Sequence, residues 1–390
     1  MWALWLVAAV FGGTGIVERL LYGERFVAYT SYVPWGMWVS AYIFFIGLSA
    51  GAFLLSSLVY VFGVRSLERI AKLSLFTAAV TLAMALLSIV FDLGHMERFW
   101  EVFTRPQFHS MMAWMVWLYT AYFTLLLAEL YFALRGDMSR TSTASHERDR
   151  RVLRILGAVG IPLAIAFHGG VGALFGTVMA REYWHSALYP IIFLVGALLS
   201  GGALMTAIVA FFWPRRDEAW RETMNFLSKL LLGLVLFDFL LEWAEYSIPG
   251  WYQIGAEYHL ISYVLFGPFW YVFWVIHLGF GVILPVLMLT LSKRPVVQGI
   301  AAALIAVTFF AIRLNLVIPG LISPELRGLQ TAYLDPIGHR LSYSYVPSIF
   351  EWQVTIGVLA IGVALFYLGC RYLPLFDQSR RVERRSEEIA

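Results

Sequence analysis

The sequence predicts an all-α integral membrane protein with about ten transmembrane helices. Of its 390 residues, 60% are hydrophobic and only 14% are charged, whereas about a quarter of the residues in a soluble domain are charged. A helix needs about 20 apolar residues to cross a bilayer. The segments that meet this requirement are residues 1–20, 35–63, 70–94, 111–134, 152–179, 187–213, 222–247, 267–292, 297–319 and 351–373.

Composition argues against several kinds of site. The single cysteine, Cys370, rules out an internal disulfide and an iron–sulfur cluster held by this chain's cysteines alone. The sequence has no CxxCH motif for covalent haem, and its net charge of +3 is too small to indicate nucleic-acid binding. We therefore expect no haem, metal or iron–sulfur cluster in this chain. The first segment lacks a basic start and a small-residue cleavage site, so we expect a retained helix.

Basic residues between the apolar segments predict the orientation. They gather in the connections after the second, fourth, sixth and eighth segments and in the C-terminal tail, which contains Arg380, Arg381, Arg384 and Arg385. Lys and Arg favour the cytoplasmic side of a membrane. We therefore expect a multi-pass protein of a bacterial or archaeal cytoplasmic membrane, with both termini in the cytoplasm and the stretch 92–98 on the outer face.

Two parts of the sequence resemble each other. LSAGAFLLSSLVYVFG (Leu48–Gly63) and LSGGALMTAIVAFFW (Leu199–Trp213) are each followed by a basic connection and by a segment that contains Phe-Asp, at Asp92 and Asp238. The small residues in both stretches permit close helix approach. We predict two repeated four-helix bundles, helices 2–5 and 6–9, with one flanking helix at each end. The corresponding divisions are residues 1–34, 35–186, 187–320 and 321–390.

The stretch FDLGHMERFW (Phe91–Trp100) closes the third apolar segment with several polar residues. Asp92 and His95 are three residues apart and would share one face of a helix. Asp92 directly follows a membrane-like run, and an acid at that depth is costly unless a function retains it. We therefore expect this stretch to form one wall of an outward-facing pocket.

A second group of polar residues is expected in the outer half of the membrane. Asp238 and Glu242 are four residues apart on one helix face, with Glu245 in the next turn. Arg313 lies at a similar depth and needs a carboxylate partner, for which Asp238 or Glu242 is the natural candidate. A structural ion pair is one interpretation. The number of polar residues, which includes His168, favours a proton relay beside a small-molecule site.

Three classes of function fit such a cluster. The first is a quinone or quinol site, and the second is a b-type cytochrome with haem on His168 and His277. The third is a proton or ion transporter with carboxylates along its path. The cytochrome interpretation depends on this one pair, because no other histidines lie inside the predicted helices. The transporter interpretation requires polar groups that lead to both faces of the membrane, but toward the inner face the sequence offers mainly Glu129 and several hydroxyl groups.

Two long outer connections, residues 248–266 and 320–350, are rich in aromatic side chains. Long aromatic loops on one face of a protein are typical of a docking surface for a partner. The alternative is that they only cap the helix bundle. The aromatic residues in question are Trp251, Tyr252, Tyr258, Tyr333, Tyr343 and Tyr345.

Three stretches resemble the NrfD-like membrane subunits, the polysulfide-reductase membrane-anchor family. They are DLGHMERFW (Asp92–Trp100), PWGMWVSAYIFFIGLSAGAFL (Pro34–Leu54) and RLNLVIPG (Arg313–Gly320). The additional end helices, with SYSYVPSIFEW (Ser342–Trp352) before the last one, are similar to the ten-helix branch of that family. This branch includes membrane subunits of hydrogenase-2-type and sulfur-metabolism complexes.

The resemblance implies a respiratory role. It implies a site for menaquinone or ubiquinone near the outer surface and an iron–sulfur, ferredoxin-like subunit docked there. It also implies a further catalytic subunit with a molybdopterin, hydrogenase or multihaem centre, while this chain contacts membrane lipid and binds no nucleic acid. Electrons would pass between quinol and the nearest cluster of the partner.

The resemblance also implies which residues form the site. His95, with Asp92 as its partner, would bond a ring oxygen of the quinone. The group formed by His168, Asp238, Glu242 and Arg313 would transfer protons. The residues expected to bind the quinone are Trp35, Trp38, Tyr42, Asp92, His95 and Arg98.

Overall fold

The computed structural model describes residues 2–30, 32–138, 143–253, 255–322 and 342–376. Ten of its helices are long and apolar enough to cross a membrane, which confirms the predicted all-α membrane fold. These are α1 (Trp2–Tyr22), α2 (Met37–Tyr60), α3 (Ala71–Asp92), α5 (Met111–Met138), α6 (Thr143–Gly176), α7 (Tyr189–Phe212), α8 (Glu218–Tyr252), η3 continued by α10 (Val272–Ile283 and Leu284–Leu291), α11 (Pro295–Ile322) and α13 (Ile349–Tyr372).

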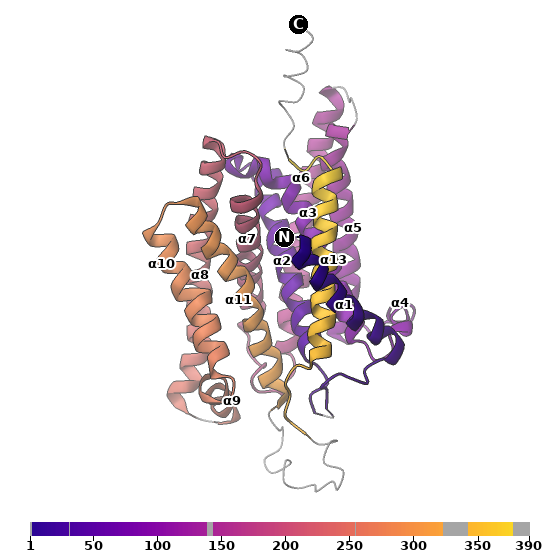
Figure 1. Ribbon diagram of the computed structural model, residues 1–390, viewed down its shortest axis with the longest axis vertical. Coiled ribbons are helices and arrows are strands. Elements are labelled where there is room, and N and C mark those ends of the chain that lie inside the picture. Colours follow the sequence, from indigo (N-terminus) through magenta and orange to yellow (C-terminus); the bar gives the residue numbers. More distant parts are fainter. Residues whose placement is uncertain (1, 31, 139–142, 254, 323–341, 377–390) are drawn as a thin grey trace.

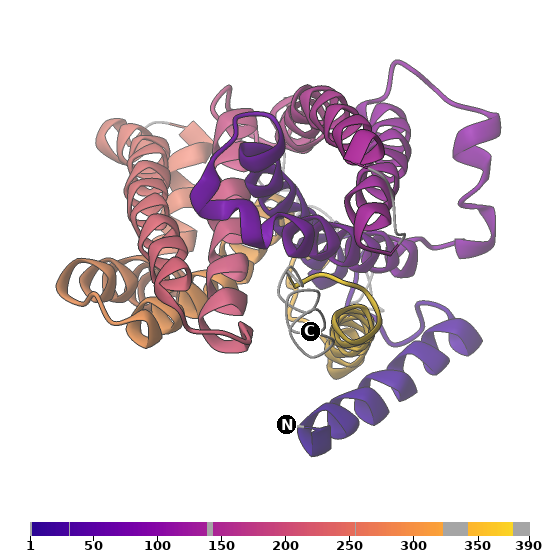
Figure 2. The same cartoon turned by 90° about the horizontal axis from the view of Figure 1, so that it is seen from above.

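The helices of the two halves of the chain lie side by side (Figure 2). In the first half α2 packs on α3 and α6, and α5 packs on α6. In the second half α7 packs on α8 and α11, and α11 packs on η3. The flanking helix α13 lies against α3, and α1 lies against α13 (Figure 2). The repeat of two equivalent bundles, with its domain boundaries, stays a prediction.

The two similar sequence stretches meet at the contact between α2 and α7. A Cβ atom built on Gly51 would lie 2.8 Å from the Cα atom of Gly201, closer than real Cβ atoms approach other atoms. Glycine is therefore required at this crossing. This close approach of the small residues in the two stretches is the one that their composition predicts.

Short elements and loops cover one end of the helices, which is the predicted outer end. They include η2 (Met96–Arg98), α4 (Glu101–Thr104) and α9 (Gly255–Phe266), and Figure 1 shows α4 and α9 at this end. The opposite end carries η1 (Arg65–Ile70) and the connection from α7 to α8. The predicted basic tail and most of the predicted loop 320–350, with Tyr333, lie outside the described residues.

Two expected boundaries were wrong. The connection predicted as a loop over 248–266 is largely helical, because α8 continues to Tyr252 and α9 follows after Gln253 in a left-handed conformation (φ 52°). The third segment ends at Asp92 and not at 94, and Leu93 is extended. Asp92 and His95 therefore do not share a helix face. The glycine that follows, Gly94, is a residue typical of helix ends.

Candidate functional site

The end of α3 is held by an arginine from the first flanking helix. Arg19 is buried, and its Nε and Nη2 atoms donate to the carbonyl oxygens of Phe91 and Leu93, each at 2.8 Å. The last carbonyl groups of a helix have no partner within the helix. Arg19 therefore caps α3 next to Asp92, and its guanidinium also lies 5.6 Å from the ring centre of Trp38.

Asp92 belongs to a cluster of hydrogen-bonded pairs at the predicted outer end of the first half. It accepts a hydrogen bond from the Tyr29 hydroxyl. A second pair of this kind joins Tyr345 to Glu351 of α13. Burial, then the nearby carboxylates, raise the pKa of both tyrosines, so their hydroxyls stay protonated donors.

Backbone groups complete this network. Glu351 is fully buried, and its Oε2 atom accepts from the amides of Ser348 (2.8 Å) and Ala28 (3.2 Å). The Met37 amide donates to the Tyr345 hydroxyl at 2.8 Å, and the Trp38 indole donates to the Glu351 carbonyl at 3.2 Å. We name as the Asp92 network the residues Arg19, Tyr29, Trp38, Asp92, Tyr345 and Glu351.

His95 and Arg98 lie outside this network. The His95 side chain is 71% exposed, and its Nδ1 atom lies 3.0 Å from Glu97 Oε1. Arg98 is also exposed and lies 3.9 Å from the same carboxylate. The predicted pairing of His95 with Asp92 is wrong, because the chain leaves the helix between them and Asp92 pairs with Tyr29.

The other expected quinone residues lie at the start of α2 and, for Trp35, just before it. Tyr42 is buried and shares a hydrogen bond with the Tyr119 hydroxyl. Trp35 is half-buried and stacks on Trp184, with ring centres 6.0 Å apart. Trp184 in turn contacts Phe175, which stacks on Phe193. Trp35 is therefore connected by a row of aromatic rings to the second half of the molecule.

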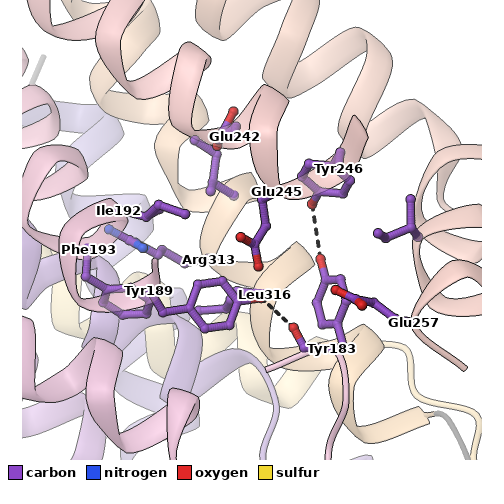
Figure 3. Close-up of a pocket in the computed structure, with 12 residues that line it drawn as sticks. Tyr183, Tyr189, Ile192, Phe193, Glu242, Glu245, Tyr246, Glu257, Arg313 and Leu316 are labelled. Atoms are coloured by element: carbon purple, nitrogen blue, oxygen red, sulfur yellow. Dashed lines mark hydrogen bonds between the residues drawn. The ribbon is translucent and has the colours of Figure 1, made fainter. Parts of the chain in front are cut away.

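That row leads to a pocket between α7, α8, α9 and α11 (Figure 3). Its empty volume is about 550 Å³, including the part that opens to the outside. We name it the Arg313 pocket. It is lined by Tyr183, Tyr189, Ile192, Phe193, Glu242, Glu245, Tyr246, Glu257, Ile261, Ile312, Arg313 and Leu316.

Hydrogen bonds between tyrosines fix the outer wall of the pocket. The Tyr183 hydroxyl donates to the Asn315 carbonyl at 3.0 Å and lies 3.1 Å from the Tyr246 hydroxyl. Tyr189 donates to the Tyr183 carbonyl at 2.6 Å. Burial raises the pKa of Tyr183, so its hydroxyl stays protonated. The loop before α7 is thereby tied to both α8 and α11.

Arg313 is the central cation of the pocket. Its guanidinium carbon lies 4.4 Å from the ring centre of Phe193 and 5.0 Å from that of Phe309. The side chain is buried, and its Nε and Nη2 atoms have no hydrogen-bond partner among the described residues. The predicted direct ion pair with Asp238 or Glu242 is not formed. Arg313 is held between two aromatic rings instead.

Glu242 pairs with a histidine. Its Oε2 atom lies 2.8 Å from Nε2 of His277, and both residues are buried. Asp238, one turn deeper on α8, is buried. Among the described residues, neither its Oδ1 atom nor either ring nitrogen of His168 has a hydrogen-bond partner. Buried polar groups normally have partners, so such exceptions are candidates for ligand or water contact.

The two histidines considered as haem ligands, His168 and His277, lie on different helices and have different neighbours in the structure. His277 uses Nε2 for the contact with Glu242, and its helix packs on α9, α10 and α11. His168 lies on α6, which packs on α2, α5 and α7, and its ring contacts Phe167 and Phe193. The arrangement gives the haem interpretation no support.

Sequence reasoning missed several residues of both regions. Tyr246 could have been found, because it continues the helical stripe of Asp238 and Glu242 at the same four-residue spacing. Tyr183 and Tyr189 belong to a short connection without a motif. Arg19 looks like an ordinary basic loop residue in the sequence, although it is buried against α3.

Comparison with known proteins gives one family. The family model described as polysulphide reductase, NrfD, matches residues 27–325. A selenate reductase subunit of Mesobacillus selenatarsenatis is 37% identical over 96% of this chain and 94% of that protein. The Hdr-like menaquinol oxidoreductase integral membrane subunit of Archaeoglobus fulgidus is 29% identical over 91% of this chain and 88% of that protein. A putative dimethyl sulfoxide reductase membrane subunit of Halobacterium salinarum is 30% identical over 87% of this chain and 83% of that protein.

Proposed function

Because the chain belongs to the NrfD family of polysulphide reductase membrane subunits, we propose that it is the quinone-binding membrane subunit of a multi-subunit reductase. It exchanges electrons between quinol in the membrane and a partner subunit. A relative over most of its length is named as a menaquinol oxidoreductase subunit. The observation that carries the proposal is the Arg313 pocket, which places apolar side chains beside tyrosine, carboxylate and arginine groups.

The pocket has the chemistry that a quinone ring requires. Ligand sites combine apolar walls with convergent polar groups that fix the orientation of the ligand. Ile192, Phe193 and Leu316 supply apolar contact for a ring. Arg313 has unpartnered donors for a quinone oxygen, and Glu242 is an acceptor for a quinol hydroxyl.

The residues of the pocket support proton-coupled electron exchange. Oxidation of a quinol releases two electrons and two protons, and reduction of a quinone takes up the same number. The Arg313 guanidinium stabilises negative charge on one ring oxygen, while Glu242 accepts or returns a proton at the other. Glu245 and Glu257 continue from Glu242 toward the outer end, where protons are exchanged.

We place the electron partner at the same end of the molecule. An iron–sulfur, ferredoxin-like subunit on the outer face would receive the electrons, and a further catalytic subunit would use them. Trp251 is 85% exposed at the end of α8, and Tyr252 beside it is also exposed. Exposed aromatic side chains are common in interfaces. In this arrangement protein and quinone occupy the cytoplasmic membrane, and both termini face the cytoplasm.

The Asp92 network is the second candidate position for the quinone. Asp92 is half-buried at the outer end, and its contact with Tyr29 places a hydroxyl and a carboxylate together beside Trp38. His95 and Arg98 would then act only after moving from their exposed positions. The two positions predict different results for the same set of variants.

Binding of a fluorescent quinone analogue, heptyl-hydroxyquinoline N-oxide, to the purified chain tests the proposal. Loss of a hydrogen bond to a charged group costs about 1.5 to 3 kcal/mol, so Glu242→Gln and Arg313→Leu should each weaken binding roughly tenfold to a hundredfold. The exposed Arg105→Leu is the control. Unchanged affinity in both pocket variants, with affinity lost in Asp92→Asn, would move the site to the Asp92 network. No binding to the unmodified chain would contradict the quinone function.

A further inference from the structure

We propose that His277, presented by the π-helix η3, is a positioning residue that holds the Glu242 carboxylate away from Arg313. This inference rests on the proposed quinone function of the pocket and identifies what keeps its donor and acceptor apart. His277 itself is absent from the residues that line the pocket. It acts through Glu242, which does line it.

The first observation is the contact between the two side chains. His277 Nε2 and Glu242 Oε2 are 2.8 Å apart, and both residues are buried. Because Oε2 is bound to the imidazole, Oε1 is the oxygen that remains for a ligand. The His277 ring also lies 5.7 Å from that of Phe273, which lies 5.2 Å from that of Tyr246. The pair is thereby packed against a wall of the pocket.

The second observation is that Arg313 is unpaired among the described residues. A buried arginine and a buried carboxylate in one cavity attract each other strongly, because the surroundings are of low polarity. Arg313 nevertheless lies between Phe193 and Phe309 with Nε and Nη2 unpartnered. The bond to His277 accounts for this, since it engages Glu242 from the side of η3 while Arg313 approaches from α11.

The third observation is the helix type. η3 is a π-helix over Val272–Ile283, with His277 in its middle. π-Helical turns are rare and are frequently found at functional sites. Their wider turn changes the direction of each side chain relative to an α-helix, so the same sequence in an α-helix would direct His277 elsewhere. Gly281 fits this turn closely to α11, since a Cβ atom there would lie 2.6 Å from Thr308 Oγ1.

The charged and titratable groups around the pair come from every neighbouring element of the pocket. They are Asp238, Glu245 and Tyr246 on α8, Glu257 on α9, Arg313 on α11, Tyr189 on α7 and Tyr183 in the loop before α7. Only Arg313 among them carries a permanent positive charge. Without His277, the Glu242 carboxylate would turn to Arg313, and the resulting ion pair would occupy the donor and the acceptor that a quinone needs.

The test is a double-mutant cycle on the full-length chain, read by the affinity for heptyl-hydroxyquinoline N-oxide. We expect His277→Leu to weaken binding about tenfold, as the loss of one charged hydrogen bond would. His277→Gln keeps a donor near the position of Nε2 and should bind within about threefold of the unmodified chain. In the background of Glu242→Gln, His277→Leu should have no further effect, because residues that act through one group are non-additive.

Each other outcome counts against the inference. Equal affinity of His277→Leu and the unmodified chain, or additive effects of the two substitutions, would overturn it. Weak binding by both His277→Gln and His277→Leu would show that the imidazole is needed for more than positioning. If His277→Leu does not fold, His277→Asn replaces it, because its shorter amide does not reach Glu242. His109→Leu, an exposed histidine, is the matched control.

Failure of the proposed function has a different signature. If the unmodified chain does not bind the analogue, or if Glu242→Gln binds it normally, the pocket is not a quinone site whatever His277 does. If Glu242→Gln binds weakly and His277→Leu binds normally, the pocket holds quinone and only the positioning role is wrong.

Discussion

The Asp92 network and the Arg313 pocket use the same residue types at the same end of the helices, but they differ in how far their polar groups are satisfied. In the network, Arg19, Asp92 and Glu351 all have hydrogen-bond partners. In the pocket, two nitrogens of Arg313 and one oxygen of the neighbouring Asp238 have none among the described residues.

The flanking helices explain this difference. Arg19 comes from α1 and Glu351 from α13, and these two helices pack on the first half of the molecule. Within the described ranges, neither flanking helix packs on α8 or η3; the short helix α9 packs there instead and lines the pocket, which opens to the outside. Fully satisfied polar networks fix a structure, whereas unsatisfied buried groups are candidates for binding. We therefore interpret the network as structural and the pocket as functional.

The largest expected effect is a loss of stability when the Asp92 network is disrupted. Glu351→Ala leaves the amides of Ala28 and Ser348 and the Tyr345 hydroxyl without their acceptor. Each such loss costs about 1 to 3 kcal/mol, so the free energy of unfolding should fall by at least about 3 kcal/mol. Thermal unfolding in detergent, followed by tryptophan fluorescence, measures this. Glu222→Ala, at an exposed position, is the control, and an equal midpoint for both variants would refute the structural role.

Arg313→Met should show the opposite behaviour. A buried charge without a partner is costly, and Arg313 forms no ion pair with a described carboxylate, so an apolar side chain of similar length should not destabilise the fold. We expect an unfolding midpoint at or above that of the unmodified chain, with quinone-analogue affinity at least about tenfold lower. Loss of folded protein would show that Arg313 is structural, as the ion-pair interpretation of the sequence requires.

Asp92→Asn should have a modest effect on stability and none on quinone affinity. The amide oxygen still accepts the hydrogen bond from Tyr29, so only the charge contribution of about 1 kcal/mol is lost. Tyr29→Phe, which removes the donor, is the comparison variant. Calorimetry and the fluorescence titration together measure both quantities. A lost affinity in Asp92→Asn, with folding intact, would favour the network as the quinone site.

The smallest expected effect concerns pH at the mouth of the pocket. Burial, together with the charge of Glu182, raises the pKa of Glu257. A carboxyl group whose folded-state pKa is raised opposes folding when it is ionised, so this cost disappears as pH falls through that pKa. The unfolding midpoint should therefore rise slightly as pH falls from neutral toward the ordinary pKa of glutamate, about 4.3. Glu257→Gln should remove this part of the slope, and an identical slope would contradict the assignment.

Sequence patterns predicted the helices well because apolar length decides which segments cross a membrane. The ten segments were found, and the small residues at Gly51 and Gly201 correctly indicated a close helix contact. That Glu242 and Arg313 lie at a similar depth followed from the count of residues along each helix, and both line one pocket. These are properties of single helices or of local spacing, which a sequence displays directly.

Contacts between distant segments could not be predicted. Nothing in the local sequence indicates that Arg19 caps α3 or that Glu351 reaches Ala28. The pairing of Glu242 with His277 depends on a π-helix, and hydropathy does not distinguish helix types. The assumption that the third helix continued past Asp92 placed His95 in the pocket, although Gly94 could have marked the helix end.

The position of the quinone headgroup tests the central claim most directly. A photoreactive quinone, activated in membranes that contain the full-length chain, labels the residues that surround it, and peptide mapping identifies them. The account predicts labels within residues 189–193, 242–246 and 312–316 of the Arg313 pocket, reduced by an excess of unmodified quinone. Labels confined to residues 29–42 and 92–100, around the Asp92 network, would contradict it.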